Sequence, residues 1–525
     1  MKKIKIAIAF ALILLMGACD VEYFDNPNAP SSAPTDALFN QNTGRMTNAI
    51  DDMWWGGRFT WTIMQYWYQT EYTDEDRYLF RESQRQRQNT LYEVAENYRE
   101  IIRLNTDEST RDAAASSGAN ENQIATCRIM LAYLFDEMVS AWGDLPYWSY
   151  GSDDTDFQAL QLSGVDETNE TPAYATQDKI LEDILNELSA AHDQLDANLP
   201  GMAGDNIYGG DPTAWKKFAN SLRLRIALKI RGVNQTLADQ HISDAISDGV
   251  FESNADNAMF QYESTDANAA PAYRAWFVGN RSDFAISHPF ITLLKGENMV
   301  GHDHVTRVVG TNDNPFLGLE DPRLHIYAQL SLDGDYVGMP IAATSSEAAA
   351  FTWRSLPGTA IIEVPDFAVT YMDYAEVAFI LSEQNAWNQT EYTNGITASM
   401  QKWGVDQADI DTYVAAVPPA GEETVLTQKY IALYLQGMTP WVEYRRTGYP
   451  RTVIPINGEY SVYVPATDVW WDYTFVPLVD GLTDLPYRMK YPQQEQTLNG
   501  DSRAAAASGL SNGDAINSKL WWDVN

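Results

Sequence analysis

Hydrophobic residues recur at three- and four-residue steps in five segments of the chain, which is the spacing of one face of an α-helix. Polar residues fill the other positions, so each helix would be amphipathic and would need a neighbouring helix to cover its apolar face. The five segments are residues 124–142, 177–199, 213–231, 371–387 and 427–444. Breaks rich in Gly, Pro and Asn punctuate them, so we expect helical hairpins packed in the manner of tetratricopeptide repeats, although no clean repeat length is visible.

Two long regions lack this periodicity. Residues 233–370 and 446–525 are rich in Gly, Pro, Asn and Asp, with scattered Trp and Tyr and room for a few short strands. Long irregular stretches inside a large domain are typical of functional loops. We therefore predict a mainly α fold, in which one domain over residues 39–525 combines a tetratricopeptide-like helical-hairpin scaffold with long irregular ligand-binding loops.

The N-terminus has the layout of a secretory signal peptide. Three lysines, an apolar run too short to span a membrane and the pair Gly17-Ala18 precede Cys19. This predicts a lipoprotein signal peptide over residues 1–18, cleavage before Cys19 and lipidation of that cysteine; an ordinary signal peptide with a chance cysteine is the alternative. Residues 19–38, rich in Pro, Ser, Asn and Asp, would then form a flexible tether.

The charge balance limits the partners. The chain has 72 acidic and 35 basic residues, a formal net charge of -37, and loss of the signal peptide would remove three more lysines and no acids. Nucleic-acid binding needs clustered Lys and Arg, so it is excluded as a function. Electrostatic adhesion to anionic lipid is equally unfavourable, so we expect membrane contact through the N-terminal lipid only.

Aromatic side chains are abundant, with 16 Trp, 29 Tyr and 18 Phe. Their flat faces stack on the apolar faces of sugar rings, so Trp- and Tyr-rich loops favour a saccharide ligand. The densest cluster runs from Trp54 to Tyr72, and within it Trp54, Trp61 and Tyr68 share a seven-residue helical spacing that favours the core. The predicted ligand contacts are four other aromatic residues, two from that cluster and two from irregular segments: Trp67, Tyr72, Trp276 and Trp353.

No metal or cofactor is predicted. The pair His302 and His304 would need a third ligand from elsewhere, and the spacing of a helical zinc site is absent. The acidic segments 153–156 and 333–335 could hold calcium through oxygen ligands, but neither fits the EF-hand pattern, so we interpret both as solvated turns.

Several segments resemble the SusD/RagB family of outer-membrane lipoproteins, and they follow the family's order along nearly the whole chain. They are AWGDLPY (141–147), TPAYATQDKILEDILNELSAAHDQL (171–195), DPTAWKKFANSLRLRIALKI (211–230), EDPRLHIYA (320–328), TYMDYAEVAFILSEQNAW (370–387), TPWVEYRRTGYP (439–450), RMKYPQQEQTLN (488–499) and SKLWWDVN (518–525). In WVEYRR we interpret Arg445 and Arg446 as internal ion-pair and helix-end partners rather than ligand contacts.

The resemblance implies a surface lipoprotein of the outer membrane, facing the cell exterior, that lies over a TonB-dependent, SusC-like channel. It implies capture of a nutrient, an oligosaccharide being favoured, and no enzymatic activity. Two alternatives remain open: a carbohydrate-active hydrolase, whose pair of carboxylates cannot be picked out among 72 acids, and a peptide-binding or protein-interaction helical-repeat lipoprotein. The matching motifs fall mostly on scaffold helices, so they do not identify the ligand.

Overall fold

The computed structural model describes residues 34–81, 84–160 and 171–525. The predicted signal peptide, Cys19 and most of the predicted tether lie outside these ranges. None of the helices in the described ranges combines the length and the apolar character that a membrane span needs.

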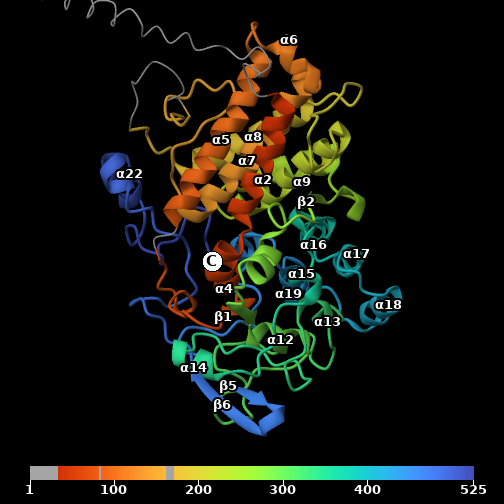
Figure 1. Ribbon diagram of the computed structural model, residues 1–525, viewed down its shortest axis with the longest axis vertical. Coiled ribbons are helices and arrows are strands. Elements are labelled where there is room, and N and C mark those ends of the chain that lie inside the picture. Colours follow the sequence, from red (N-terminus) through yellow and green to blue (C-terminus); the bar gives the residue numbers. More distant parts are fainter. Residues whose placement is uncertain (1–33, 82–83, 161–170) are drawn as a thin grey trace, which may run out of the picture.

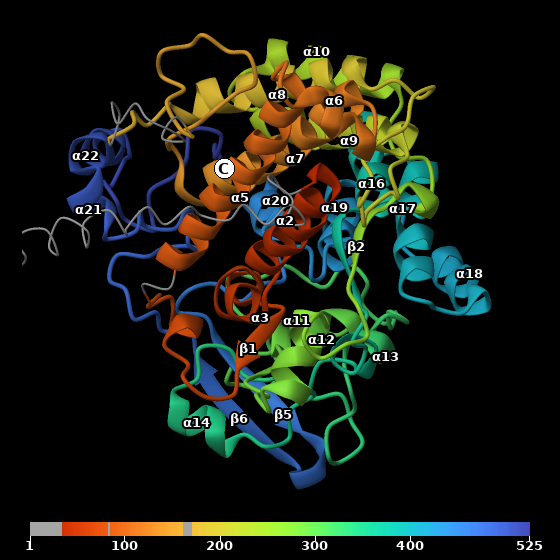
Figure 2. The ribbon, with the colours of Figure 1, turned by 45° about the horizontal axis from the view of Figure 1, so that its top comes forward.

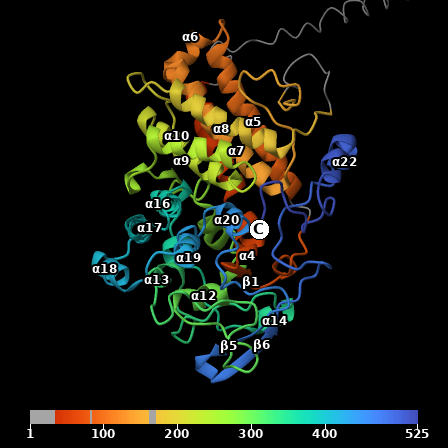
Figure 3. The ribbon, with the colours of Figure 1, turned by 180° about the vertical axis from the view of Figure 1, so that it is seen from behind.

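Six long helices form one end of the molecule (Figures 1 and 3). Each packs against the next along the chain, so that consecutive helices form hairpins. In order they are α2 (Thr35–Ile50), α5 (Gln84–Thr106), α7 (Asn120–Trp142), α8 (Gln177–Gln194), α9 (Pro212–Ile230) and α10 (Gln235–Asp248).

A second helical group continues this scaffold. Helix α16 packs against α17 and α19, α17 packs against α18, and α9 joins the two groups through its contacts with α16 and α20. The five helices are α16 (Tyr374–Gln384), α17 (Gln389–Lys402), α18 (Gln407–Ala416), α19 (Glu422–Ala432) and α20 (Thr439–Thr447). The predicted mainly α, helical-hairpin fold is therefore confirmed.

The rest of the described chain forms loops, helical turns and two-stranded antiparallel sheets (Figure 2). The sheets pair β1 (Trp67–Gln69) with β3 (Phe284–Ile286), β2 (Ala258–Gln261) with β4 (Ala368–Met372), and β5 (Glu459–Val464) with β6 (Val469–Thr474). The short α-helices are α3 (Met53–Trp55), α4 (Trp61–Ile63), α6 (Arg111–Ala114), α11 (Pro271–Tyr273), α12 (His288–Leu294), α13 (Leu324–Tyr327), α14 (Ser345–Ala350), α15 (Thr359–Ile362), α21 (Glu495–Leu498) and α22 (Gly500–Ser508). Two π-helical turns, η1 (Gly56–Thr60) and η5 (Arg274–Val278), each follow a short α-helix directly.

Four predicted boundaries are wrong. The helix expected over residues 427–444 is split into α19 and α20, because Leu435 and Gly437 adopt positive φ angles of 62° and 51°. Residues 371–372 belong to strand β4, and α16 follows from Tyr374. Helix α10 lies inside the region 233–370 that was expected to be irregular, and α2 begins at Thr35, within the predicted tether.

The interpretation of Arg445 and Arg446 as internal partners is confirmed. Arg446 makes a bidentate ion pair with Glu383, with both Nη–Oε distances at 2.7 Å, and also pairs with Glu443. Arg445 is buried and donates to the backbone oxygens of Ser140 and Tyr487. Both arginines therefore hold the scaffold together.

Candidate functional site

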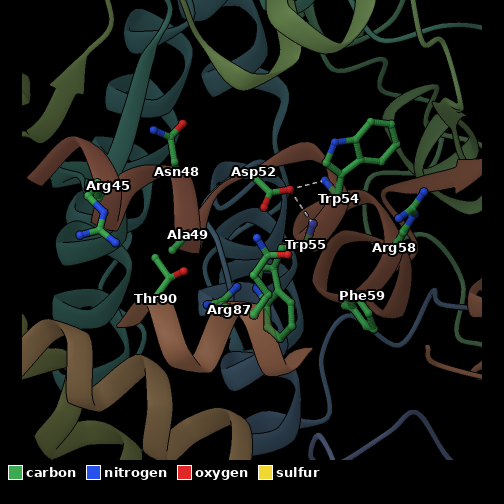
Figure 4. A pocket seen from close by; sticks show the side chains of 11 residues that line it. Arg45, Asn48, Ala49, Asp52, Trp54, Trp55, Arg58, Phe59, Arg87 and Thr90 are labelled. Atoms are coloured by element: carbon green, nitrogen blue, oxygen red, sulfur yellow. Dashed lines mark hydrogen bonds between the residues drawn. The ribbon is translucent and has the colours of Figure 1, made fainter. Parts of the chain in front are cut away.

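A pocket of about 540 Å³ opens where the end of α2 meets α3, η1 and the first turns of α5 (Figure 4). Asn48 and Ala49 of α2 line one side, Arg87 and Thr90 of α5 another, and Trp54 with Trp55 a third. The pocket is thus built by the start of the scaffold and by the short irregular segment that leaves it.

Asp52 sets the geometry of this segment. Its Oδ1 accepts hydrogen bonds from the backbone N–H groups of Trp54 and Trp55, which makes it the N-cap of α3. Burial raises the pKa of Asp52, and the two backbone donors oppose that shift. The cap fixes the two indoles at the wall of the pocket, Trp55 buried and Trp54 half-buried.

Two guanidinium groups hold the Trp54 ring. The Cζ of Arg58 lies 4.6 Å from the ring centroid and that of Arg281 lies 5.1 Å from it, both within the range of a cation–π contact. Arg281 also forms an ion pair with Asp283. The indole is therefore fixed in orientation while part of its surface stays open to solvent.

Phe284 joins Trp54 to two of the sequence-predicted aromatic residues. Its ring centroid lies 5.9 Å from that of Trp54, 6.0 Å from that of Trp67 and 6.4 Å from that of Trp276. Trp67 and Trp276 also touch each other edge to face at 6.2 Å. Trp67 is fully buried and Trp276 half-buried, so Trp67 supports the surface aromatic residues from beneath and is closed to direct ligand contact.

Tyr72 is the most open of the four predicted contacts, with 57% of its surface exposed. The pKa of Arg281 is raised, first by its hydrogen bond with Asp283 and further by Tyr72 and Glu71, which places both residues near that guanidinium. Phe277 is also exposed and stacks on Tyr273 at 5.2 Å. Tyr72 follows strand β1, which carries Trp67, and Phe277 follows Trp276 directly in η5, so both exposed rings lie on the segments of the predicted pair.

Trp353 belongs to a different aromatic group. It packs on Phe351 at 6.0 Å and on Trp471 of strand β6 at 5.7 Å. The neighbouring residue, Arg354, has a pKa lowered by burial, and the charge of Glu71 opposes that shift. Because Glu71 directly precedes Tyr72, the aromatic group around Trp353 lies close to the segment that carries Tyr72. The four predicted residues thus fall into one contacting pair, Trp67 with Trp276, and two separate positions at the edge of the same region.

A smaller hollow of about 350 Å³ lies between α12 and the β5–β6 hairpin, with Tyr336, Tyr463 and Trp470 among its lining residues. His304 stacks on Trp470 at 4.7 Å and contacts Oδ1 of Asp472 at 3.0 Å, so it braces the hairpin. We place the candidate site in the larger pocket because the sequence-predicted pair, Trp67 and Trp276, gathers beside it.

The described residues contain no group of three or more His, Cys, Asp or Glu side chains placed to hold a metal ion. In the acidic segment 153–156, Asp154 and Asp156 both bind the ammonium group of Lys179, with Nζ–Oδ2 distances of 3.3 Å and 2.6 Å. These carboxylates act as partners of a lysine on α8.

Sequence reasoning missed the central residues of the site, Trp54, Arg58 and Arg281. Trp54 was assigned to the core because it shares seven-residue spacing with Trp61 and Tyr68. That spacing does not describe one helix here, since the π-helical turn η1 interrupts α3 and α4, and Tyr68 lies in strand β1. A usable signal was the double glycine Gly56-Gly57, which interrupts the periodic pattern directly after the two tryptophans.

Comparison with known proteins assigns the family. A model of SusD-like proteins, described as starch-binding and associating with the outer membrane, matches residues 27–466, and a second, described as SusD and RagB outer-membrane lipoprotein, matches residues 420–523. The chain belongs to the SusD-like family. A search of curated proteins found no match.

Solved structures share the fold at low sequence identity. A chitin-binding protein is 20% identical, with a TM-score of 0.72 over 94% of this chain and 100% of its own. A chitin-binding SusD homologue from Flavobacterium johnsoniae is 20% identical, with a TM-score of 0.69 over 94% and 99%. A SusD homologue from Bacteroides uniformis is 21% identical, with a TM-score of 0.68 over 94% and 99%.

Proposed function

We propose that this protein is a lipoprotein, anchored through Cys19 and facing the cell exterior, that captures an oligosaccharide and delivers it to a TonB-dependent, SusC-like transporter. Membership of the SusD-like family supports the location and the nutrient-binding role. The observation that carries the saccharide assignment is the half-buried Trp54, held by Arg58 and Arg281 at the wall of a pocket of about 540 Å³.

The chemistry of this pocket suits a sugar ring. The indole of Trp54 offers a flat apolar surface on which a pyranose can stack, and the amide of Asn48, the hydroxyl of Thr90 and the guanidinium groups can bond its hydroxyls. Exposed Tyr72 and Phe277 nearby would hold further sugar units of the same chain. Two of the similar structures are named chitin-binding proteins, which agrees with a saccharide ligand.

A hydrolase is less favoured. Glycoside hydrolysis needs two carboxyl groups on opposite sides of the scissile bond. Among the described residues that line the pocket, Asp52 is the one acid, and its Oδ1 is already engaged as the cap of α3. Reversible binding without cleavage is the chemistry that this side-chain set supports.

Calorimetric titration tests this proposal. The full-length protein in detergent would be titrated with chitooligosaccharides, maltooligosaccharides and peptides, and the ligand analysed afterwards. We expect saturable saccharide binding with the ligand recovered intact, and a loss of that binding in Trp54→Ala. The matched control is Trp387→Ala, on the turn between α16 and α17, which should bind as the unaltered protein does. Cleaved ligand would favour the hydrolase, and binding of peptides alone would reject the saccharide assignment.

A further inference from the structure

The pocket reverses the charge balance of the chain. Three arginines, Arg45, Arg58 and Arg87, line it together with the single acid Asp52, whereas the whole chain has 72 acids and 35 basic residues. Arg45 already pairs with Glu93 at the protein surface. The other two arginines are the informative ones, because within the described part of the protein Arg87 has one long ion pair and Arg58 has none.

Arg87 is buried, with only 8% of its surface exposed, and none of its three guanidinium nitrogens has a hydrogen-bond partner among the described residues. Its Cζ lies 3.5 Å from the centroid of the Trp55 ring (Figure 4). Its ion pair with Glu137 is long, with 3.5 Å between Nη2 and Oε2. All three nitrogens are closed to solvent, so Arg87 acts on a ligand in the pocket through the field of its buried charge.

The carboxyl groups that face Arg87 are Asp51, Asp52 and Glu137. Burial raises the pKa of all three, that of Glu137 to about 7. Burial also lowers the pKa of Arg87, but only to about 10, so the guanidinium stays charged at neutral pH.

Arg58 provides a second cation, one that has no ion-pair partner among the described residues. It makes no ion pair within residues 34–81, 84–160 and 171–525, and its Nε is buried without a hydrogen bond. The acids near it, Glu75 and Asp283, are already paired with Arg81 and Arg281. Arg58 lies beside the Trp54 ring, where a stacked ligand would reach it (Figure 4).

We infer that the pocket takes an acidic saccharide, one whose sugar units carry carboxylates. The ring of one unit stacks on Trp54, and its carboxylate accepts charge-assisted hydrogen bonds from Arg58, while the buried charge of Arg87 adds a field that favours an anion in the pocket. Guanidinium groups bind carboxylates in a planar, two-point geometry that a neutral hydroxymethyl group cannot match. This inference rests on the proposed saccharide-binding function and specifies the class of saccharide.

Matched pairs of ligands test the inference. Tetragalacturonate and a hyaluronan tetrasaccharide, each as the free acid and as its methyl ester, would be titrated calorimetrically into the full-length protein in detergent. The ester keeps the ring and removes the charge. We expect at least one acid to bind about 10-fold more tightly than its ester, as one charge-assisted contact allows, and its affinity to fall with added salt.

Variants assign the effect to the pocket. Arg58→Gln should remove most of the preference for the acid over the ester, and Arg87→Gln the rest, with circular dichroism as the check on folding. Arg103→Gln is the control. Arg103 lies on α5, as Arg87 does, but about 24 Å further along the helix axis, where it is exposed and paired with Glu100.

Equal binding of acid and ester, or a preference that survives both variants, would overturn the inference. So would binding of neutral chitooligosaccharides without binding of either acid, although the proposed function would then stand. Failure of every saccharide, acidic and neutral, would instead reject the proposed function itself.

Discussion

The indole Nε1 of Trp67 donates a hydrogen bond of 2.6 Å to the hydroxyl of Tyr434. The two residues are 367 positions apart in the sequence, and both are buried. Their bond ties strand β1, beneath the candidate site, to the junction between α19 and α20. The floor of the site is thereby attached to the scaffold.

A double-mutant cycle on Trp67 and Tyr434 would measure this attachment. We expect Trp67→Phe and Tyr434→Phe each to lower the free energy of unfolding, by about 1 to 3 kcal/mol, because each leaves a buried polar group unpaired. The double variant should lose less than the sum of the two, since it leaves neither partner. Urea unfolding of all four proteins gives the coupling energy, and strictly additive losses would show that the bond contributes nothing.

Gly57→Ala should weaken both stability and saccharide binding. A Cβ added at Gly57 would lie 2.6 Å from the ring of Phe284, the residue that joins Trp54, Trp67 and Trp276. Overpacking of this kind costs about 1 to 3 kcal/mol, and here it would displace the ring that supports Trp54. Gly500→Ala is the control, because a Cβ there meets nothing within 4 Å. Unchanged saccharide binding in Gly57→Ala would show that the position of the Phe284 ring does not affect the binding site.

Arg446→Met should be strongly destabilising. Glu383 would remain largely buried without its partner, and Glu443 would keep only its pair with Lys429. Breaking one side of a buried ion pair costs about 3 to 5 kcal/mol. Arg103→Met removes an exposed pair with Glu100 and should cost no more than about 1 kcal/mol. Urea midpoints compare the two, and similar losses would show that burial of the Arg446 pairs has no energetic effect.

Asp76 should make stability fall as the pH rises from 5 to 8. Burial, opposed by two hydrogen bonds from Gln69, raises the pKa of Asp76 from 3.8 to about 8. Below pH 8 the folded protein keeps a proton that the unfolded chain releases above about pH 4, so raising the pH favours unfolding across this interval. Asp76→Asn keeps the shape and removes the titration. The stability difference between the two proteins should therefore shift in favour of the variant from pH 5 to pH 8, and a constant difference would contradict the raised pKa.

Cys19→Ala should release the protein from membranes. The proposed lipid anchor depends on the thiol of Cys19, and no helix of the described ranges can span the membrane in its place. Fractionation of cells that produce the two forms checks this, with Cys127→Ala as the control, because Cys127 is buried in α7. Retention of Cys19→Ala in the membrane fraction would refute the lipid anchor.

The scaffold could be predicted because its helices are amphipathic over many turns. The segments now seen as α7, α8 and α9 show apolar residues at helical spacing, and their ends were placed within about five residues. Helix α5 was missed although its apolar residues, among them Leu91, Ala95, Tyr98 and Ile102, recur at three- and four-residue steps. Local backbone conformation was hidden in a stricter sense, because the positive φ of Leu435 has no signal in residue type.

The candidate site was predicted only in part, because its residues come together through tertiary contacts. Trp67 and Trp276 were identified by composition and do meet, but their burial depends on Phe284 and Tyr434, which lie far from Trp67 in the sequence. Arg58 could not be distinguished from other arginines, since what sets it apart is that none of the residues the structure describes forms an ion pair with it. Absence of an ion pair is a property of the folded chain alone.

The arrangement around Phe284 also makes the fluorescence of Trp54 sensitive to a ligand in the pocket. Trp54 is half-buried and contacts two guanidinium groups, so a ligand placed on its ring would change the polarity around that indole and hence its emission. Trp67, which also contacts Phe284, is sealed from solvent and hydrogen-bonded, so a ligand on Trp54 would leave its surroundings unchanged. Occupancy of the pocket can therefore be followed by intrinsic tryptophan fluorescence, on the unlabelled protein and at concentrations far below those that calorimetry requires.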